Sequence, residues 1–285
     1  MSKGVRDMLI AVICFALMNL CIKLLPGIPS MEIVFFRCLI AMLMSFYFLR
    51  GIPVSWWGKN RLFLALRGIF GTMALYFFFV TVKHIPFASA VTLAYTSPIF
   101  TTVLASWFLK EKVAWFQWVF FGISFCGVVL LKGLDTRIPV QYFTFGLLSA
   151  ICSSLAYIMV RCMKETEHPQ VVVLHFQVIG TVAGLALSIG HFVIPSGWSW
   201  LLVVLVGILA FVGQVYLTYA LQGEKIGVVS SLNFSGVVFA AGFGWLLFKE
   251  HITMANLVAI ILVAVGVIGN IWVDKITTST GQGVK

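Results

Sequence analysis

Charged side chains are scarce in this sequence. Asp, Glu, Lys and Arg make up only 10% of the 285 residues, whereas soluble domains average about 25%. Hydrophobic residues make up 61%. A chain with so few polar side chains cannot cover a globule that faces water on all sides, so its composition excludes an ordinary soluble domain.

Sequence motifs for several kinds of chemistry are missing as well. The six cysteines form no Cys-x-x-Cys pair and show no disulfide or zinc spacing, and the five histidines are dispersed. No phosphate-binding P-loop occurs, which argues against ATP hydrolysis. An enzyme would place several acids, histidines or a nucleophile at one membrane depth, and the sequence has no such cluster. We therefore expect no cofactor, no metal and no enzymatic activity.

What the sequence does contain is a series of long apolar runs. Each is close to the ~20 residues that a helix needs to cross a ~30 Å hydrocarbon core. Each is also about twice as long as a spanning β-strand and lacks its alternation. The first run exceeds the ~7–15-residue core of a signal peptide. The sequence thus predicts an all-α integral membrane protein with ten transmembrane helices, at residues 5–25, 30–49, 62–82, 87–109, 114–132, 142–161, 170–192, 198–221, 226–248 and 252–273.

The basic residues predict the orientation of the chain. A net charge of +10 is spread over short loops without a basic patch, so we expect a lipid bilayer and no nucleic acid as partner. If the N-terminus lies in the cytoplasm, the basic residues on the outer side of the membrane are only four: Lys83, Lys132, Arg137 and Lys249. The cytoplasmic basic residues are then Lys3, Arg6, Arg50, Lys59, Arg61, Arg67, Lys110, Lys112, Arg161, Lys164, Lys225, Lys275 and Lys285. This positive-inside bias predicts a multi-pass protein of a bacterial inner membrane with both termini in the cytoplasm.

The sequence also repeats itself. Residues 68–131 align with 207–270 without a gap, which matches Gly68-Ile69 to Gly207-Ile208, Lys110-Glu111 to Lys249-Glu250 and Gly127-Val128 to Gly266-Val267. We therefore divide the chain into a first repeat at 1–135, a second repeat at 140–275 and a cytoplasmic tail at 276–285. Because each repeat has five spans, an odd number, the second repeat enters the membrane from the opposite side. Such inverted repeats are common in secondary transporters.

Several short motifs in the first half resemble a known family. They are Leu66-Arg67-Gly68, Ala74-Leu75-Tyr76-Phe77, His84-Ile85-Pro86, Ala88, Ala90, Tyr95-Thr96-Ser97-Pro98 and Leu109-Lys110-Glu111-Lys112. With them the chain resembles the EamA domain of the drug/metabolite transporter superfamily over nearly its whole length. The resemblance implies two repeats and a metabolite carrier with a central cavity between them. The second half departs from the pattern, with Val237 at the position of Pro98 and Gly227 at that of Ala88.

Charged residues inside the spans are the first candidates for substrate binding. Arg37 lies seven residues past Ser30, roughly 10 Å into its helix. A charge at that depth is costly, and its planar guanidinium could bind a carboxylate or phosphate. The alternative is a structural pin bonded to carbonyls or to Glu32. Lys23 is a second candidate, near the outer end of the first helix, where snorkelling to the interface is the alternative.

Neutral polar residues complete the predicted site. Asn19, Gln177, Gln214 and Asn233 lie well inside spans, where amides bind substrate or join neighbouring helices. Three tyrosines near mid-span, Tyr76, Tyr95 and Tyr157, are further candidates for the cavity wall.

Two backbone features also fall within spans. Pro98 interrupts the helical hydrogen bonds, which indicates either a hinge or a static kink. Gly180-x-x-x-Gly184 offers a close-packing face, so the sequence leaves open whether the protein is a monomer or a dimer.

The charge of the core predicts the class of substrate. No Asp or Glu lies at mid-span, while Arg37 does, so the membrane interior is net positive. We therefore expect a secondary transporter of a small anionic or zwitterionic metabolite, such as an amino acid. The alternatives are a channel, a membrane scaffold without transport, and an exporter of drugs or organic cations.

Overall fold

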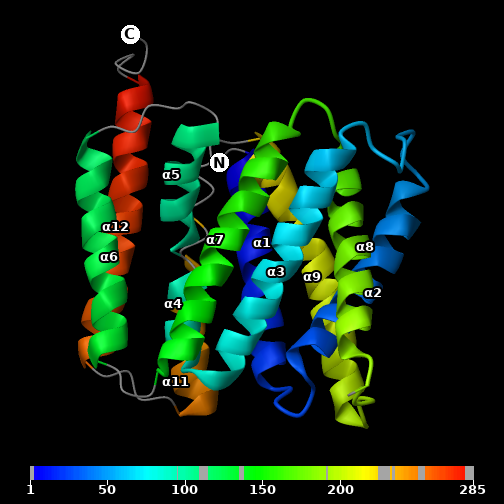
Figure 1. The fold of residues 1–285 in the computed structure, drawn as a ribbon, viewed down its shortest axis with the longest axis horizontal. Helices are drawn as coiled ribbons and strands as arrows, with labels where there is room; N and C mark the ends of the chain where they lie inside the picture. The colour runs from blue at the N-terminus through cyan, green and yellow to red at the C-terminus, as the bar shows by residue number, and fades with distance from the viewer. Residues whose placement is uncertain are drawn as a thin grey trace.

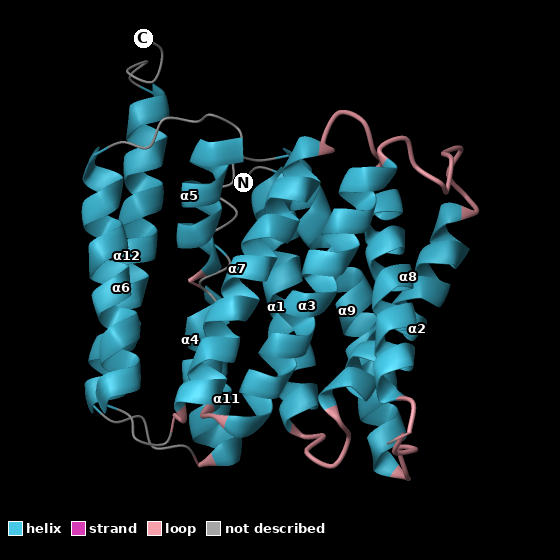
Figure 2. Ribbon diagram, in the orientation of Figure 1, coloured by secondary structure: helices cyan, strands magenta, loops and turns pink. Residues whose placement is uncertain are grey.

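The computed structural model describes residues 3–94, 96–108, 115–134, 138–190, 192–223, 232, 235–249 and 254–279. Within these ranges the regular elements are all α-helices, and no strand occurs (Figures 1 and 2). The helices are α1 (Lys3–Lys23), α2 (Ser30–Leu49), α3 (Arg61–His84), α4 (Phe87–Ala94), α5 (Ser97–Phe108), α6 (Trp115–Leu134), α7 (Val140–Cys162), α8 (Pro169–Ser188), α9 (Trp198–Gly223), α11 (Ser235–Phe248) and α12 (Met254–Ser279).

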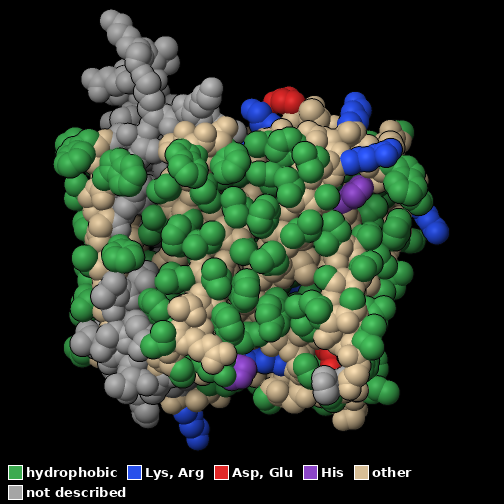
Figure 3. Space-filling model, in the orientation of Figure 1, with side chains coloured by type: hydrophobic (Ala, Val, Ile, Leu, Met, Phe, Trp, Pro, Cys, Tyr) green, Lys and Arg blue, Asp and Glu red, His purple; other side chains and the backbone are tan. Residues whose placement is uncertain are grey.

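The helices lie side by side with their axes roughly aligned, and the start of α1 and the end of α12 lie at the same end of the bundle (Figure 1). Hydrophobic side chains cover the middle of the face in Figure 3, and most basic side chains lie towards its two ends. Seven described segments are long and apolar enough to cross a membrane: α1, α2, α3, Phe87–Phe108, α7, α8 and α9. Shorter apolar helical stretches lie at Trp118–Gly127, Phe239–Phe248 and Leu257–Gly266.

The predicted span at 87–109 is broken where a kink was expected. Helix α4 ends at Ala94 and α5 begins at Ser97, so Pro98 is the second residue of a new helix. The backbone N–H and the hydroxyl of Thr96 both donate to the carbonyl of Leu93, which closes the end of α4. In the first turn of a helix the missing N–H of proline costs nothing, so a break here is cheaper than a bend.

The main helix contacts join the two halves of the chain. Helix α1 packs on α9, α3 on α7, α2 on α8, α6 on α12 and α4 on α11. Glycines allow the close approach of α6 and α12, since a Cβ at Gly127 would lie 2.9 Å from the Ala259 carbonyl and one at Gly266 2.0 Å from the Ser124 hydroxyl. Small residues of this kind are typical of helix packing in membranes.

The glycines of α8 pack inside the chain. A Cβ at Gly180 would lie 2.5 Å from the Cys38 sulfur, and one at Gly184 would lie 2.7 Å from the backbone nitrogen of Phe35. Both contacts are with α2 of the same molecule. The Gly180-x-x-x-Gly184 face therefore packs on α2 within the protomer.

The last helix is longer than its apolar run. Helix α12 continues through Ser279, into the segment expected as a tail. The apolar run marks the part of a helix that meets lipid, and the backbone bonds continue beyond it into polar residues.

Candidate functional site

A cavity of about 110 Å³ lies in the centre of the bundle. Its walls come from α1, α2, α3, α4, α5, α7, α8 and α9, so both halves of the chain contribute. The lining residues are Phe15, Met18, Asn19, Arg37, Arg67, Gly71, Ala74, Leu75, Phe78, Ala94, Ser97, Ser149, Ser153, Ala156, Tyr157, Phe176, Gln214 and Leu217.

Two buried arginines contribute to the cavity wall. Arg37 of α2 is 0% exposed, and Arg67 of α3 is 3% exposed. Both approach the ring of Phe176 on α8, with their Cζ atoms 5.4 Å and 4.3 Å from the ring centroid. A guanidinium at this distance is attracted by the negative face of the ring, so Phe176 holds both arginines in place.

The hydrogen bonds of the two guanidinium groups are incomplete. Arg67 Nη2 donates to Gln214 Oε1 over 3.1 Å, and Arg37 Nη1 makes a weak contact of 3.5 Å with the Cys38 sulfur. Nε and Nη2 of Arg37 and Nε of Arg67 are buried without a partner among the described residues. The ion pairs among the described residues are Arg6–Asp7 and Lys164–Glu165, so neither Arg37 nor Arg67 takes part in one. The cavity wall thus holds two cations that no described carboxylate neutralises.

Gly71 makes room for Arg67. It lies one turn further along α3, and a Cβ there would lie 2.2 Å from Arg67 Nη1 and 2.8 Å from the Phe176 ring. Only glycine leaves this space free. The position of the Arg67 guanidinium at the cavity therefore depends on a residue that makes no polar side-chain contact of its own.

The rest of the wall combines neutral polar groups with apolar ones. Asn19, Tyr157, Ser97, Ser149 and Ser153 supply amide and hydroxyl groups. The apolar contribution is largely aromatic and aliphatic, from Phe15, Met18, Leu75, Phe78 and Leu217. A cationic region beside an apolar wall with a few polar groups suits a small molecule that has an acidic group and a partly apolar body.

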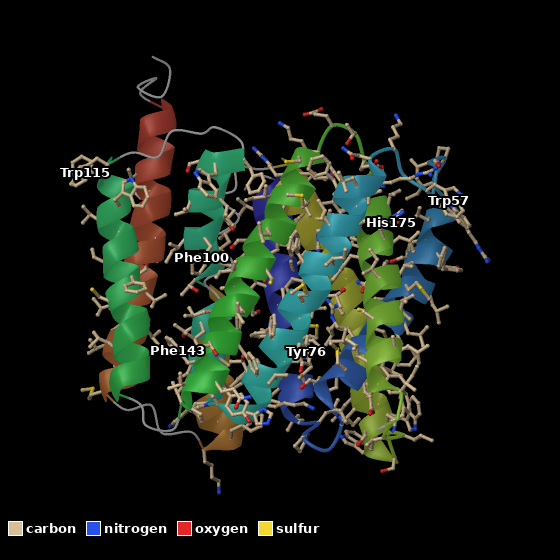
Figure 4. All side chains as sticks on the ribbon, viewed as in Figure 1. Trp57, Tyr76, Phe100, Trp115, Phe143 and His175 are labelled. Carbon is tan, nitrogen blue, oxygen red and sulfur yellow. The ribbon has the colours of Figure 1, made fainter. Side chains whose placement is uncertain are left out.

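Four of the predicted site residues line this cavity. They are Asn19, Arg37, Tyr157 and Gln214. Gln177 is fully buried next to Phe176 in the sequence, but it is not a lining residue, and neither atom of its amide has a partner among the described residues. Tyr76 lies on α3 (Figure 4) outside the lining, with its ring 5.5 Å from that of Phe77.

Two candidates, Tyr95 and Asn233, lie outside the described residues. The break before Pro98 does reach the cavity, because Ala94 and Ser97 on its two sides are lining residues.

Lys23 lies at the end of α1, away from the cavity. Its Nζ donates to the carbonyls of Val82 and Ile85 over 2.9 Å and 2.8 Å. These contacts tie α1 to the end of α3, and Lys23 is not a lining residue of the cavity. Glu32, the alternative partner considered for Arg37, instead accepts a hydrogen bond from the backbone of Val193.

Arg67 is the site residue that sequence reasoning missed. It was counted with the cytoplasmic basic residues because it lies near the start of its apolar run, but the structure buries it in the cavity wall. Its depth is comparable to that of Arg37, because Arg67 lies six residues past the first residue of α3 and Arg37 lies seven past that of α2. Because α2 and α3 run in opposite directions, the two helices enter the bundle from opposite ends, and their arginine side chains both reach the Phe176 ring.

Comparisons with known proteins agree with this architecture. The profile of the EamA-like transporter family matches residues 2–132 and 141–272. The pseudopaline exporter of Pseudomonas aeruginosa is 29% identical, over 93% of this chain and 95% of its own length. An uncharacterized transporter of Helicobacter pylori is 30% identical over 91% of each chain. A solved crystal structure, 17% identical, covers 96% of this chain and 98% of its own with a TM-score of 0.72, and so shares the fold.

Proposed function

Because this chain belongs to the EamA-like transporter family and is a membrane transporter, we propose that it is a secondary carrier of a small anionic or zwitterionic metabolite. It moves this substrate across the cell membrane by alternating access, with both termini in the cytoplasm. The arginine pair in the cavity wall is the observation on which the proposal rests.

Electrostatics connects the arginine pair to the substrate. A buried cation without a partner is costly, and two of them beside one aromatic ring also repel each other. A substrate carboxylate or phosphate would neutralise them, and arginine can bind either group through two parallel hydrogen bonds. A purely cationic substrate would add to the repulsion. The cavity therefore favours an acidic group on the substrate.

The helix contacts support two inverted repeats of five spans each. In chain order α1, α2, α3 and α6 of the first half correspond to α7, α8, α9 and α12 of the second. If each helix is replaced by its counterpart in the other half, the α1–α9 contact becomes the α7–α3 contact, which is also present. The α2–α9 contact likewise becomes the α8–α3 contact, which is present as well. The α2–α8 and α6–α12 contacts map onto themselves. This is the pattern expected for a two-fold axis through the central cavity.

The size of the cavity supports alternating access. At about 110 Å³ it is smaller than the roughly 300–1,000 Å³ of typical ligand pockets. A metabolite of amino-acid size or larger therefore needs the helices to separate before it can enter. A carrier that opens to one side at a time has this requirement, whereas a channel keeps a continuous path.

Labelling of single cysteines tests the topology. In a cysteine-free background, we expect Lys110→Cys to react with an impermeant maleimide only from the cytoplasmic side, and Lys249→Cys only from outside. The two positions correspond in the aligned repeats but are separated by an odd number of spans. Equal labelling of both from outside intact cells would contradict the inverted repeat.

The helix break before Pro98 predicts a second result. Pro98→Ala removes the ring that clashes with the carbonyl of Ala94 and supplies an N–H that can bond this carbonyl, which should favour a continuous, stiffer helix through α4 and α5. We expect turnover in proteoliposomes to fall several-fold while the substrate dissociation constant changes little. Unchanged turnover with normal expression would show that the break plays no part in the transport cycle.

The substrate class can be tested directly with purified protein. A thermal-shift screen with amino acids, organic acids, nucleotides and organic amines identifies ligands of the folded state, which raise its apparent stability. Hits are then measured for counterflow and saturation in proteoliposomes, with efflux examined first because one relative is named as an exporter. If the best substrate is a permanent cation without an acidic group, the proposed substrate class is wrong.

A further inference from the structure

A buried carboxylate joins the two halves of the chain at the end of the bundle where α1 begins. Glu167, in the loop between α7 and α8, is 7% exposed. Its Oε1 accepts hydrogen bonds from the backbone N–H groups of Lys59 and Asn60, each at 2.5 Å. These two residues immediately precede α3, where unpaired N–H groups and the helix dipole attract an anion. The second half thus holds the start of α3 in the first half.

The loop before α3 is shaped for this contact. Gly58 has φ = +65°, a left-handed conformation that favours glycine. A Cβ at this position would lie 3.1 Å and 3.3 Å from the two carboxylate oxygens of Glu167 and 2.3 Å from Leu64. Glycine therefore permits both the turn and the close approach of the carboxylate to the backbone.

A second buried carboxylate joins the halves at the opposite end. Glu32, in the first turn of α2, is 1% exposed, and its Oε1 accepts a hydrogen bond of 3.0 Å from the backbone of Val193. Val193 belongs to the loop between α8 and α9. The neighbouring Phe192 packs its ring on those of Phe35 and Phe36, with centroids 5.9 Å and 5.6 Å apart. Here the first half holds a loop of the second half.

The two contacts are reciprocal. Glu167 holds the loop that follows α2, and Glu32 holds the loop that follows α8, the helix that corresponds to α2 in the other half. Each contact also involves a helix that carries one of the cavity arginines. The Glu167 contact lies just before α3, which contains Arg67, and Glu32 lies on α2 together with Arg37. Movement at either end is therefore transmitted to a helix of the cavity wall.

We propose that Glu167 and Glu32 are two gating latches, one on each side of the membrane, which open one at a time during transport. The proposal rests on the alternating-access carrier described above. In the present structure both carboxylate–amide contacts are formed, in agreement with the small cavity between them. Opening to the cytoplasm breaks the Glu167 contact and leaves the Glu32 contact intact, and opening to the outside does the reverse.

Side-specific labelling of the cavity tests the latches without a substrate. The variant Ser153→Cys, in a background without the six native cysteines, places one thiol in the cavity wall. An impermeant maleimide is applied to right-side-out or inside-out membrane vesicles. Loss of hydrogen bonds to a charged group should shift the closed–open equilibrium by about tenfold or more. We expect Glu167→Ala to raise the labelling rate about tenfold from the cytoplasmic side alone, and Glu32→Ala to raise it from the outside alone.

The same loop offers a matched control. Glu165 lies two residues from Glu167, its side chain is 81% exposed, and it pairs with Lys164, so Glu165→Ala should leave both rates unchanged. Glu167→Gln keeps the shape and one acceptor but loses the charge, and should give a smaller rise than Glu167→Ala. Gly58→Ala disturbs the same contact from the other half and should act from the cytoplasmic side. It also keeps the test possible if Glu167→Ala does not fold.

Several outcomes would overturn the proposal. These are unchanged labelling in folded variants, equal increases from both sides, or increases from the same side for Glu167→Ala and Glu32→Ala. Because the maleimide needs no substrate, the result is independent of the proposed substrate class. A side-specific effect in a protein that transports only cations would support the latches and contradict the arginine pairing.

Discussion

Replacing Arg67 by glutamine is expected to lower the affinity for an anionic substrate at least about 30-fold. Removing one partner of a buried, hydrogen-bonded charge pair costs ~2 kcal/mol or more, and tenfold corresponds to about 1.4 kcal/mol. Arg67 is a buried residue of the cavity wall, and Gln214 accepts a hydrogen bond that orients its guanidinium. Binding to purified protein and counterflow in proteoliposomes measure the loss.

Substitutions of Arg37 should also lower transport. Arg37→Lys should impair transport, because an ammonium group is a point charge and cannot replace the planar fork. Arg37→Gln, which removes the charge as well, should impair it further while leaving folding largely intact. Arg61→Gln is the matched control, since Arg61 is an exposed residue at the start of α3. Normal transport by both Arg37→Gln and Arg67→Gln would show that the two arginines have a structural role and do not bind the substrate.

Gly71→Ala is expected to weaken substrate binding by roughly 10- to 100-fold, although the new methyl group is apolar and small. The added Cβ would lie 2.2 Å from Arg67 Nη1, so the guanidinium must move. A displacement of about 1 Å in a binding group can cost this much. Ligand binding and counterflow, measured as for the arginine variants, test the expectation.

Gly68→Ala provides the control on the same helix. A Cβ at Gly68 would lie 2.3 Å from the Ile179 Cδ1, so it crowds α8 to a similar degree but displaces an apolar side chain. Overpacking of about 1–3 kcal/mol should affect the thermal stability of both variants. Only Gly71→Ala should lose affinity. Equal losses of affinity in the two variants would mean that general packing, and not the position of Arg67, controls binding.

The length and composition of the apolar runs predicted the all-helical class correctly, and seven of the described segments are long and apolar enough to cross a membrane. A membrane removes water from the backbone, so each crossing requires a continuous apolar helix, and this requirement is visible in the sequence. The starts of α2 at Ser30 and α9 at Trp198 agree with the predicted residues. The break before Pro98 and the extension of α12 to Ser279 differ from the prediction, because apolar runs do not mark where a helix is interrupted or where it continues into polar residues.

The site was harder to predict, because it depends on contacts between distant parts of the chain. The sequence identified Arg37 from its depth in a span, but nothing in it brings Phe176 between two arginines. Arg67 was missed because a basic residue near the end of a span resembles an ordinary interfacial one. The contact of Glu167 with Asn60 joins residues separated by 107 positions, and no local pattern reveals it.

The contacts between halves also determine when this protein can fold. During synthesis α1 and α6 are inserted long before α9 and α12, on which they mainly pack. The first repeat therefore has no complete set of neighbours until the last helix has left the ribosome. Although the sequence repeats, neither half completes its helix packing alone, and a ribosome that stalls before α12 leaves the close-packing surface of α6 without its partner helix.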